Sequence, residues 1–388
     1  MDIKIMTEDI EEAAIKQVKT LSETSAFKGS RIRIMPDVHA GKGSVVGFTA
    51  KDPTHIIPNV IGVDIGCAML TIELGKVDID LKELDAVIHE HIPSGFNVHE
   101  EPCTTFPFNK LKMHSQLKNI DHLACSLGTL GGGNHFIELD IDDLGNKYLV
   151  IHTGSRNLGQ QVANHYQKKA IAYQKAKKLD IPAIIEKLKS ENRHSEIEAA
   201  ILDAKSKQII INEDLAHLSE EDSLDYLHDM RLTQEYSSKN RRLTADIILD
   251  KMQLKELGSF ETMHNYYSFT DNTIRKGAIS ANKGEIVLIP LNMKEGCIIA
   301  EGLGNADWNN SAPHGAGRRL SRNKARATLD FEAFEQSMEG IYTTSVTPST
   351  LDEAPLAYKD FNTILELIPD TVRVIKRIKP IYNFKAHD

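Results

Sequence analysis

Long apolar runs are absent from this chain of 388 residues. No segment approaches the ~20 consecutive apolar residues that cross a bilayer. Residues 1–21 are acidic and amphipathic, unlike the basic and then apolar pattern of a signal peptide. Both absences count against a membrane protein and a secreted one. We therefore expect a cytoplasmic protein without a membrane partner.

Cysteine is scarce as well. The four cysteines, Cys67, Cys103, Cys125 and Cys297, stand far apart and form no CxxC pair. This spacing excludes a disulfide framework and a zinc ribbon. In a reducing compartment, a single cysteine near carboxylates and imidazoles is better suited to bind a metal as a thiolate.

An excess of positive charge is also missing, because the net charge is −9. This excludes attraction of nucleic acid by the whole surface, but not by a local basic channel. Basic residues gather in two stretches, at 318–326 after a glycine-rich turn and at 371–379. We interpret the first as functional, whereas the second fits either a functional surface or a solvated helix face. The residues are Arg318, Arg319, Arg322, Lys324 and Arg326 in the first, and Arg373, Lys376, Arg377 and Lys379 in the second.

The remaining composition, with 41% hydrophobic and 26% charged residues, is that of an ordinary globular protein. Hydrophobic periodicity predicts strands at 31–37, 68–75, 135–141, 147–153, 285–291, 297–304 and 381–384. It predicts helices at 7–21 and 80–91, from about 317, and near 371–379. Glycine is absent between 160 and 257, where the sequence is helical in character. We predict an α+β protein with a β-rich core and an inserted helical subdomain at about 160–257.

Two glycine-rich patches carry candidate metal ligands. In the segment 62–67, a strand runs into a turn that presents Asp64 and Cys67, a carboxylate and a thiol three residues apart. They suit a shared metal ion, or equally a turn aspartate beside a buried cysteine. In the segment 127–138, three successive glycines allow close approach of a backbone to a ligand and can bind an anion. Asn134, His135 and Glu138 follow them.

Three further patches present single histidines. His152 ends an apolar strand, and Arg156 follows in a polar turn suited to phosphate contact. His264 precedes an asparagine and a tyrosine; a single histidine at such a place is more often structural. His314 is followed by small residues that leave its ring accessible and open a helix N-terminus toward a phosphate.

Taken together, these patches provide a mixed set of oxygen, sulfur and nitrogen ligands. His314 is an additional histidine outside this set. Such a set suits two divalent transition ions better than magnesium, which prefers oxygen ligands. Spacing alone does not choose among manganese, zinc and iron. The candidate ligands are Asp64, Cys67, His135, His152 and His264.

The combination of motifs resembles the RtcB family of RNA ligases. The matching segments follow the family's order over nearly the whole chain, at 36–43, 62–67, 131–138, 152–157, 264–266, 275–278 and 314–318. The resemblance implies a single catalytic domain over 1–388, with an RtcB-like β-rich core and surrounding helices. It also implies a GTP- and Mn²⁺-dependent ligase that joins an RNA 3′-phosphate or 2′,3′-cyclic phosphate to a 5′-hydroxyl. The RNA would be tRNA or cleaved ribosomal RNA.

The resemblance also implies a role for each matching residue. His314 matches the nucleophile that takes GMP. The five candidate ligands match the positions that hold two Mn²⁺ ions, with Cys67 as the bridge. Asp37 lies in a patch tied to the active centre, Arg156 matches an RNA-phosphate contact, and Arg318 is expected to support RNA binding. The guanylate-binding positions match Asn134, Glu138, Ala316, Gly317, Tyr358 and Lys385.

The segment 290–297 departs from the family pattern. The family's Pro-Gly-Ser-Met-Gly is replaced by the sequence from Pro290 to Lys294, and a second expected serine is Cys297. Asn292 is the substitute donor that we expect to contact the nucleotide phosphates. The departure and the shorter chain resemble divergent paralogues with a release-factor-like partner and a role in repair; an archease-like activator is a further candidate partner. Two alternatives are a metal-dependent cyclic phosphodiesterase and a non-ligating protein that binds RNA ends.

Overall fold

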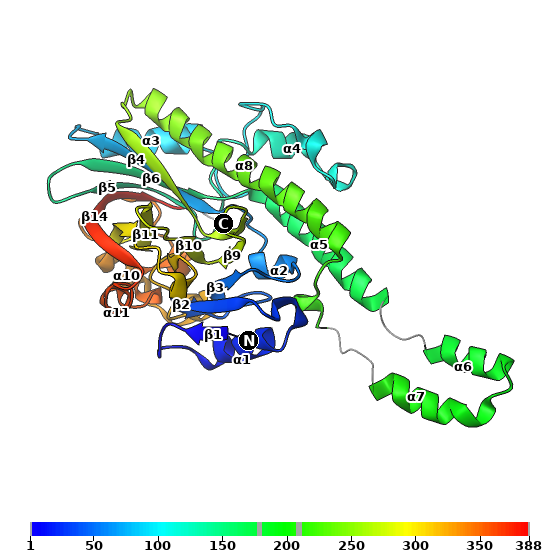
Figure 1. Ribbon diagram of the computed structural model, residues 1–388. Coiled ribbons are helices and arrows are strands. Elements are labelled where there is room, and N and C mark those ends of the chain that lie inside the picture. Colours follow the sequence, from blue (N-terminus) through cyan, green and yellow to red (C-terminus); the bar gives the residue numbers. More distant parts are fainter. Residues whose placement is uncertain (1, 177–180, 207–211, 387–388) are drawn as a thin grey trace.

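Two curved β-sheets and a set of surrounding helices form the protein (Figure 1). The computed structural model describes residues 2–176, 181–206 and 212–386. The predicted α+β class is confirmed. None of the helices in these ranges combines the length and the apolar character that a bilayer span requires.

The larger sheet has the strand order β11-β12-β14-β5-β6-β4-β7, and all neighbours are antiparallel. It curls until its two edges meet, where the Leu288 N–H donates to Thr262 Oγ1 at 2.9 Å. Alternate residues therefore point into the curl or outward to the helices. The strands are β4 (Ala68–Gly75), β5 (Phe136–Ile141), β6 (Lys147–Thr153), β7 (Gly258–Met263), β11 (Ile286–Asn292), β12 (Gly296–Gly302) and β14 (Val372–Phe384).

The smaller sheet has the order β1-β2-β3-β9-β8, in which only β1 and β2 are parallel. A two-stranded ribbon of β10 and β13 pairs antiparallel. The strands are β1 (Asp2–Ile5), β2 (Arg31–His39), β3 (Val46–Lys51), β8 (Asn265–Ser268), β9 (Thr273–Lys276), β10 (Ala278–Ser280) and β13 (Ser311–Pro313).

Helices cover the outer faces of both sheets. Helix α3 illustrates why they form: Leu84 and Ile88 are buried one turn apart, and the Asp80 side chain caps the N-terminus. The helices besides those of the next paragraph are α1 (Glu12–Ser22), α2 (Pro58–Ile61), α3 (Leu81–His91), α4 (Ile120–Cys125), α9 (Arg322–Thr328), α10 (Phe331–Ser337) and α11 (Phe361–Leu367).

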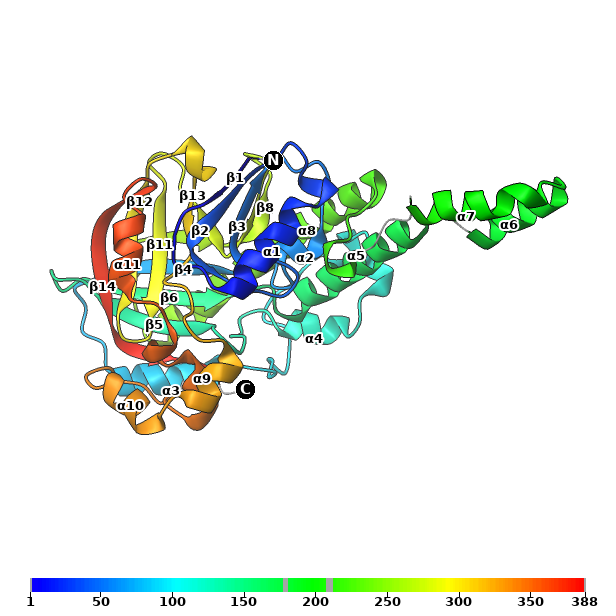
Figure 2. The same ribbon diagram turned by 90° about the horizontal axis from the view of Figure 1, so that it is seen from below.

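The region predicted as an inserted helical subdomain contains α5 (Arg156–Ala176), α6 (Ile181–Ser190), α7 (Ile197–Ser206) and α8 (Glu220–Lys251). Helix α8 is part of the main body, because Tyr236 packs in the core beside the smaller sheet and Ile248 in the core beside the larger one. Only α6 and α7 project away from the body (Figures 1 and 2). A separate subdomain over the whole range is therefore not confirmed.

Two helix predictions were wrong. The segment predicted as a helix near 371–379 lies in β14, where Val372, Ile378 and Pro380 are buried. Three of its basic residues form ion pairs instead of a helix face, namely Arg373 with Glu301, Lys376 with Asp142 and Arg377 with Glu295. The helix expected from about 317 begins only at Arg322, because Ser321 caps it. His314 therefore lies in a loop before α9, and it does not open a helix N-terminus toward a phosphate.

Candidate functional site

A cavity of about 350 Å³ lies where the ends of strands from both sheets and the loop after β13 meet. Most residues that the sequence singles out line this cavity, although they come from distant parts of the chain. These are Asp64, Asn134, Glu138, His152, His264, Asn292, His314, Ala316, Gly317, Arg318, Tyr358 and Lys385. Cys67, His135, Asp37 and Arg156 are absent from this lining.

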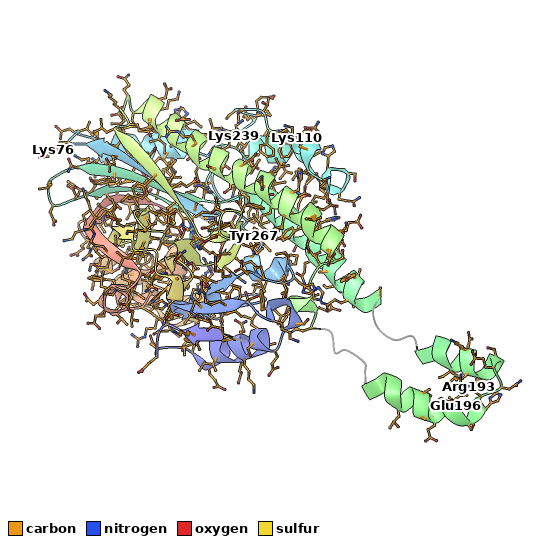
Figure 3. The ribbon with its side chains drawn as sticks, in the orientation of Figure 1. Lys76, Lys110, Arg193, Glu196, Lys239 and Tyr267 are labelled. Atoms are coloured by element: carbon orange, nitrogen blue, oxygen red, sulfur yellow. The ribbon has the colours of Figure 1, made fainter. Side chains whose placement is uncertain are left out.

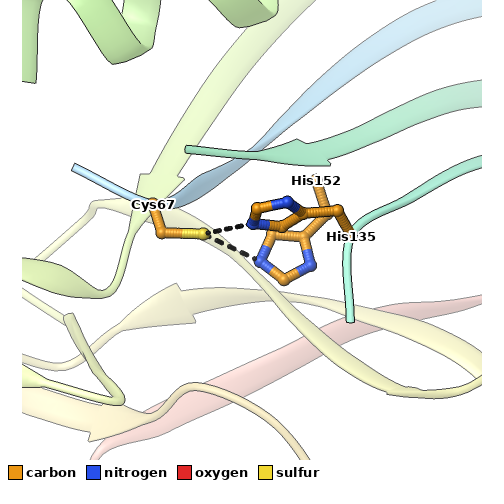
Figure 4. Close-up of side chains that lie close together, drawn as sticks. All are labelled: Cys67, His135 and His152. Atoms are coloured by element: carbon orange, nitrogen blue, oxygen red, sulfur yellow. Dashed lines mark hydrogen bonds between the residues drawn. The ribbon is translucent and has the colours of Figure 1, made fainter. Parts of the chain in front are cut away.

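Cys67, His135 and His152 form a cluster beside the cavity, and of these three only His152 lines it (Figure 4). The Cys67 sulfur lies 3.3 Å from His135 Nε2 and 3.2 Å from His152 Nε2. Strand register explains the meeting, since His152 on β6 lies opposite Met69 on β4 and Phe136 on β5. Cys67 directly precedes β4 and His135 directly precedes β5. Both residues therefore lie at the same end of these strands as His152, near the end of β6.

Asp64 and His264 complete the group, which we call the His/Cys centre. Asp64 Oδ2 lies 3.0 Å from His135 Nε2. His264 lies between β7 and β8, and its backbone N–H donates to the Cys67 carbonyl at 3.0 Å. Its ring centroid is 5.1 Å from that of His152. The structure thus brings all five candidate metal ligands together.

Electrostatics in the His/Cys centre favour ligands that are ready for a cation. Burial opposes ionisation of Asp64, but the hydrogen bond and charge of His135 lower the pKa of its carboxyl to about 2. Burial and neighbouring imidazoles lower the pKa of His152 and His264 well below the usual value, so both rings are neutral with free lone pairs. Burial and the Asp64 charge raise the pKa of the Cys67 thiol, which a metal ion would reverse.

The hydrogen bonding of the His/Cys centre also fits a metal ion, because some of its nitrogen atoms have no partner among the described residues. Within the described ranges, the Nδ1 atoms of His135 and His264 are buried without a hydrogen-bond partner. Buried nitrogen atoms normally have a partner, and a metal ion is one that imidazole commonly finds. The residues present therefore fit one or two divalent transition ions.

Two glycines leave space for side chains of the His/Cys centre. A Cβ atom at Gly154 would overlap the Asp64 carboxylate, and one at Gly131 would overlap the His135 ring. Gly131 was interpreted as part of an anion-binding turn. In the structure it makes space for a ligand side chain, which is a different use of the missing Cβ.

His314 stands beside this centre, with its ring centroid 5.2 Å from that of His264. Its Nδ1 lies 2.6 Å from Asp37 Oδ2, and its backbone N–H donates to the same oxygen at 3.0 Å. Asp37 is fully buried on β2. An Asp37 carboxylate can only accept, so this contact favours the tautomer that has its proton on Nδ1 and the lone pair on Nε2. Gly317, at φ +76°, permits the close approach because a Cβ would overlap the Asp37 backbone.

Glu353 organises a second group of side chains that line the cavity, and the sequence did not single it out although it stands five residues before Tyr358. Its carboxylate receives the Tyr358 hydroxyl at 2.7 Å and lies 3.1 Å from Lys385 Nζ. Arg318 and Arg322 approach its other oxygen at 3.1 and 3.0 Å. Burial opposes ionisation, but these cations lower the pKa of Glu353 to about 2. We call these five residues the Glu353 hub. No single-sequence signal links them, because the partners come from separate segments.

Lys276 is a second residue that the sequence did not single out, although it lies within a matching segment. Its buried ammonium donates to the carbonyls of Lys42, Ser44 and Asn59 at the cavity wall. Burial lowers its pKa to about 8. It holds the loop before β3 against α2 and so shapes the cavity.

Two predicted contacts have other partners in the structure. Arg156 starts α5, and its guanidinium donates to Thr129 Oγ1 at 3.0 Å and to the Gly95 carbonyl at 2.6 Å. Asn292 lines the cavity, but its Oδ1 accepts two N–H groups of the β11–β12 turn, at Lys294 and Glu295. Its amide NH₂ is the group left to face a phosphate.

Comparison with known proteins gives one consistent result. The family model described as "tRNA-splicing ligase RtcB" matches residues 17–120 and 105–386. The RNA-splicing ligase RtcB of Escherichia coli K12 is 28% identical over 99% of this chain and 97% of its own length. The tRNA-splicing ligase RtcB of Nanoarchaeum equitans is 26% identical over 91% and 87%. RNA-splicing ligase RtcB2 of Escherichia coli ATCC 25922 is 24% identical over 97% and 93%. With a family model matching most of its length, the chain belongs to the RtcB family.

Proposed function

We propose that the protein is an RNA ligase that uses GTP and two Mn²⁺ ions to join an RNA 3′-phosphate or 2′,3′-cyclic phosphate to a 5′-hydroxyl. The relatives' names as RNA-splicing ligases support RNA ligation. The observation that carries the detailed proposal is His314, whose Nδ1 is held by Asp37 beside the His/Cys centre. The whole chain would act as one catalytic domain.

His314 is suited to act as a nucleophile. With the proton on Nδ1 directed to Asp37, Nε2 would attack the α-phosphorus of GTP; a P–N bond forms and pyrophosphate leaves. Asp37 would stabilise the positive charge that develops on the ring. The resulting phosphoramidate is a reactive store of GMP.

Asp64, Cys67, His135, His152 and His264 would hold the Mn²⁺ ions. Bound there, the ions supply charge neutralisation at the phosphates and orientation of the leaving group. The guanylate would occupy the cavity to which this centre and the Glu353 hub both contribute side chains. Its contacts would come from Asn134, Glu138, Asn292, Ala316, Gly317, Tyr358 and Lys385.

The RNA steps would follow from the same arrangement. The RNA 3′-phosphate attacks the GMP phosphorus on His314, the P–N bond breaks, and Nε2 regains its lone pair. The 5′-hydroxyl then attacks the activated 3′-phosphate and GMP leaves, which closes the phosphodiester. A cyclic phosphate must first be opened by water. Arg318, which lines the cavity, would support RNA binding. The contact of Arg156 with RNA phosphate and a release-factor-like or archease-like partner remain predictions.

Labelling with GTP radioactive at the α-phosphate tests the proposal. Wild-type protein incubated with Mn²⁺ should retain a covalent label on a neutral denaturing gel, and His314→Ala should not. His122→Ala, which changes an exposed histidine outside the cavity, is the matched control and should label normally. Absence of label from a metal-loaded wild type would contradict the proposal. Opening of a cyclic phosphate without any label would instead favour the phosphodiesterase.

A further inference from the structure

A second buried group of metal-ligand residues lies outside the His/Cys centre. One ligand atom each of Glu138, Asp140 and Cys297 lies within 4.8 Å of the others, and all three side chains are buried. Only Glu138 lines the cavity. We call this group the Glu/Asp/Cys cluster.

Strand alternation explains why the three side chains meet inside the curl of the larger sheet. On β5, Phe136, Glu138 and Asp140 point to the same face, and Phe136 packs in the core inside the curl together with Cys297 of β12. Strand β14 lies between them and pairs with both strands. The cluster therefore sits in the sheet interior, behind the cavity wall.

The cluster has too few hydrogen-bond donors for its acceptors. Among the described residues, the buried carboxylate of Asp140 has no hydrogen-bond donor besides the Cys297 thiol, and Oδ1 of Asn383 is buried without a partner. The Asn383 amide donates to one oxygen of Glu138 at 2.6 Å. The other Glu138 oxygen faces only the Cys297 sulfur, at 3.9 Å. Burying two carboxylates with so few donors disfavours their charged forms, so the group needs protons or a cation.

We propose that the Glu/Asp/Cys cluster is a further cation site, which takes a divalent transition ion through one thiolate and two carboxylates. A thiolate donor selects against Mg²⁺ and Ca²⁺, which prefer shells made only of oxygen. Binding would release the thiol proton and any carboxyl proton to solvent. Asn383 Oδ1 is a further oxygen beside the site. An ion here would also fix Glu138 as a carboxylate at the cavity wall.

The alternative occupant is a proton. Burial and the neighbouring Glu138 raise the pKa of Asp140 well above its usual range, so the cluster without a cation holds protons. A test must therefore tell a metal ion from a proton. It must also separate Cys297 from Cys67, the other cysteine with metal-ligand neighbours.

Cadmium titration of reduced, metal-free full-length protein makes that separation. In Cys67→Ala, Cd²⁺ should still produce the ultraviolet thiolate-to-metal absorption band, because Cys297 remains. The band should disappear in Cys67→Ala/Cys297→Ala and persist in Cys67→Ala/Cys125→Ala. Cys125 is the matched control because it is a buried cysteine outside the cluster. No band in folded Cys67→Ala, or a band that survives loss of Cys297, overturns the proposal.

A second measurement covers the case in which the double variants do not fold. Native mass spectrometry of Asp140→Asn should find about one Cd²⁺ fewer per chain than in wild type, whereas Asp143→Asn, an exposed change on the following turn, should match wild type. An unchanged count in Asp140→Asn would show that the cluster holds a proton. Both experiments omit nucleotide and RNA, so their result is independent of guanylylation at His314.

Discussion

Two polar assemblies contribute side chains to the same cavity, and their hydrogen bonding differs. The His/Cys centre keeps buried imidazole nitrogens without partners among the described residues. The Glu353 hub instead pairs its central carboxylate with three cations and a hydroxyl. The first assembly is incomplete without a ligand, whereas the protein alone completes the second.

This difference indicates that the His/Cys centre and the Glu353 hub have different roles at the cavity. A network whose charges are satisfied holds its members in place, because moving any one of them exposes a buried charge. The Glu353 hub thus fixes Lys385, Tyr358 and Arg318 before anything binds. The residues of the His/Cys centre fit a metal ion, and if one binds there, the contribution of this centre depends on occupancy. Substitutions in the His/Cys centre and in the Glu353 hub should therefore have different effects on activity and stability.

Loss of the central thiolate should have the largest effect. Cys67→Ala removes the sulfur that contacts both His135 and His152. We expect loss of bound Mn²⁺ and a drop in guanylylation of more than about 100-fold, since removing groups that merely support metal ligands already costs roughly 10- to 100-fold. Metal content and labelling should fall together. Cys125→Ala is the control, and full metal content and activity in Cys67→Ala would show that the ligand assignment is wrong.

The Asp37–His314 pair lies beside the His/Cys centre and tests orientation of the nucleophile without removing a metal ligand. Asp37→Asn keeps the shape but offers an NH₂ group where Oδ2 now accepts from His314 Nδ1. The ring should shift its proton to Nε2, which removes the attacking lone pair. We expect guanylylation to slow about 10²- to 10⁴-fold, with metal content unchanged. Loss of metal together with activity would mean that Asp37 has a structural role instead; exposed Asp143→Asn is the control.

The sequence predicts strands well where local pattern and burial agree. The bounds of β4 and β6 match the predicted segments 68–75 and 147–153. It misleads at β14, where Arg373, Lys376 and Arg377 have the spacing of a helix face. There the pairing with β5 and β12 decides, because it buries Val372, Ile378 and Tyr382. Tertiary pairing of this kind is not contained in a local pattern.

For the site, the sequence indicates which residues gather but not how each is used. Small residues and single polar side chains at strand ends mark the His/Cys centre, and these residues do meet. The Glu353 hub leaves no such mark, because its partners lie between positions 318 and 385 and meet only after folding. The use of Gly131 as space for His135 also depends on packing across strands.

Neutralising the Glu353 carboxylate should have an intermediate effect on stability and on the KM for GTP. Glu353→Gln leaves the buried ammonium of Lys385 and the partly buried guanidinium of Arg318 without their anion, which should destabilise the protein by on the order of 3 kcal/mol. The KM for GTP should rise, because the side chains that the hub holds at the cavity lose their anchor. Asp352→Asn is the matched control, since its partners Arg322 and Arg326 are partly exposed. An equal loss of stability in both variants would contradict a special role for Glu353.

The pH dependence of stability should reveal the same carboxylate. Its pKa in the folded protein is about 2, below its ordinary value of 4.5, so its contribution is present above pH 4.5 and lost as pH falls toward 2. The difference in unfolding free energy between wild type and Glu353→Gln should therefore shrink over this range. Urea unfolding at several pH values measures it. A constant difference would show that folding does not shift the pKa of Glu353.

An exposed network with good geometry should matter least. Arg193 lies 2.6 Å from Glu196 and 2.9 Å from Glu191 near the turn between α6 and α7 (Figure 3). Its charge is paired, as in the Glu353 hub, but water surrounds the contacts and screens the charges. Arg193→Ala should shift Tm by less than about 2 °C and leave guanylylation unchanged. A loss of stability comparable to that of Glu353→Gln would mean that paired charges stabilise this protein whether or not they are buried. The His/Cys centre and the Glu353 hub would then differ only in whether their polar atoms have hydrogen-bond partners.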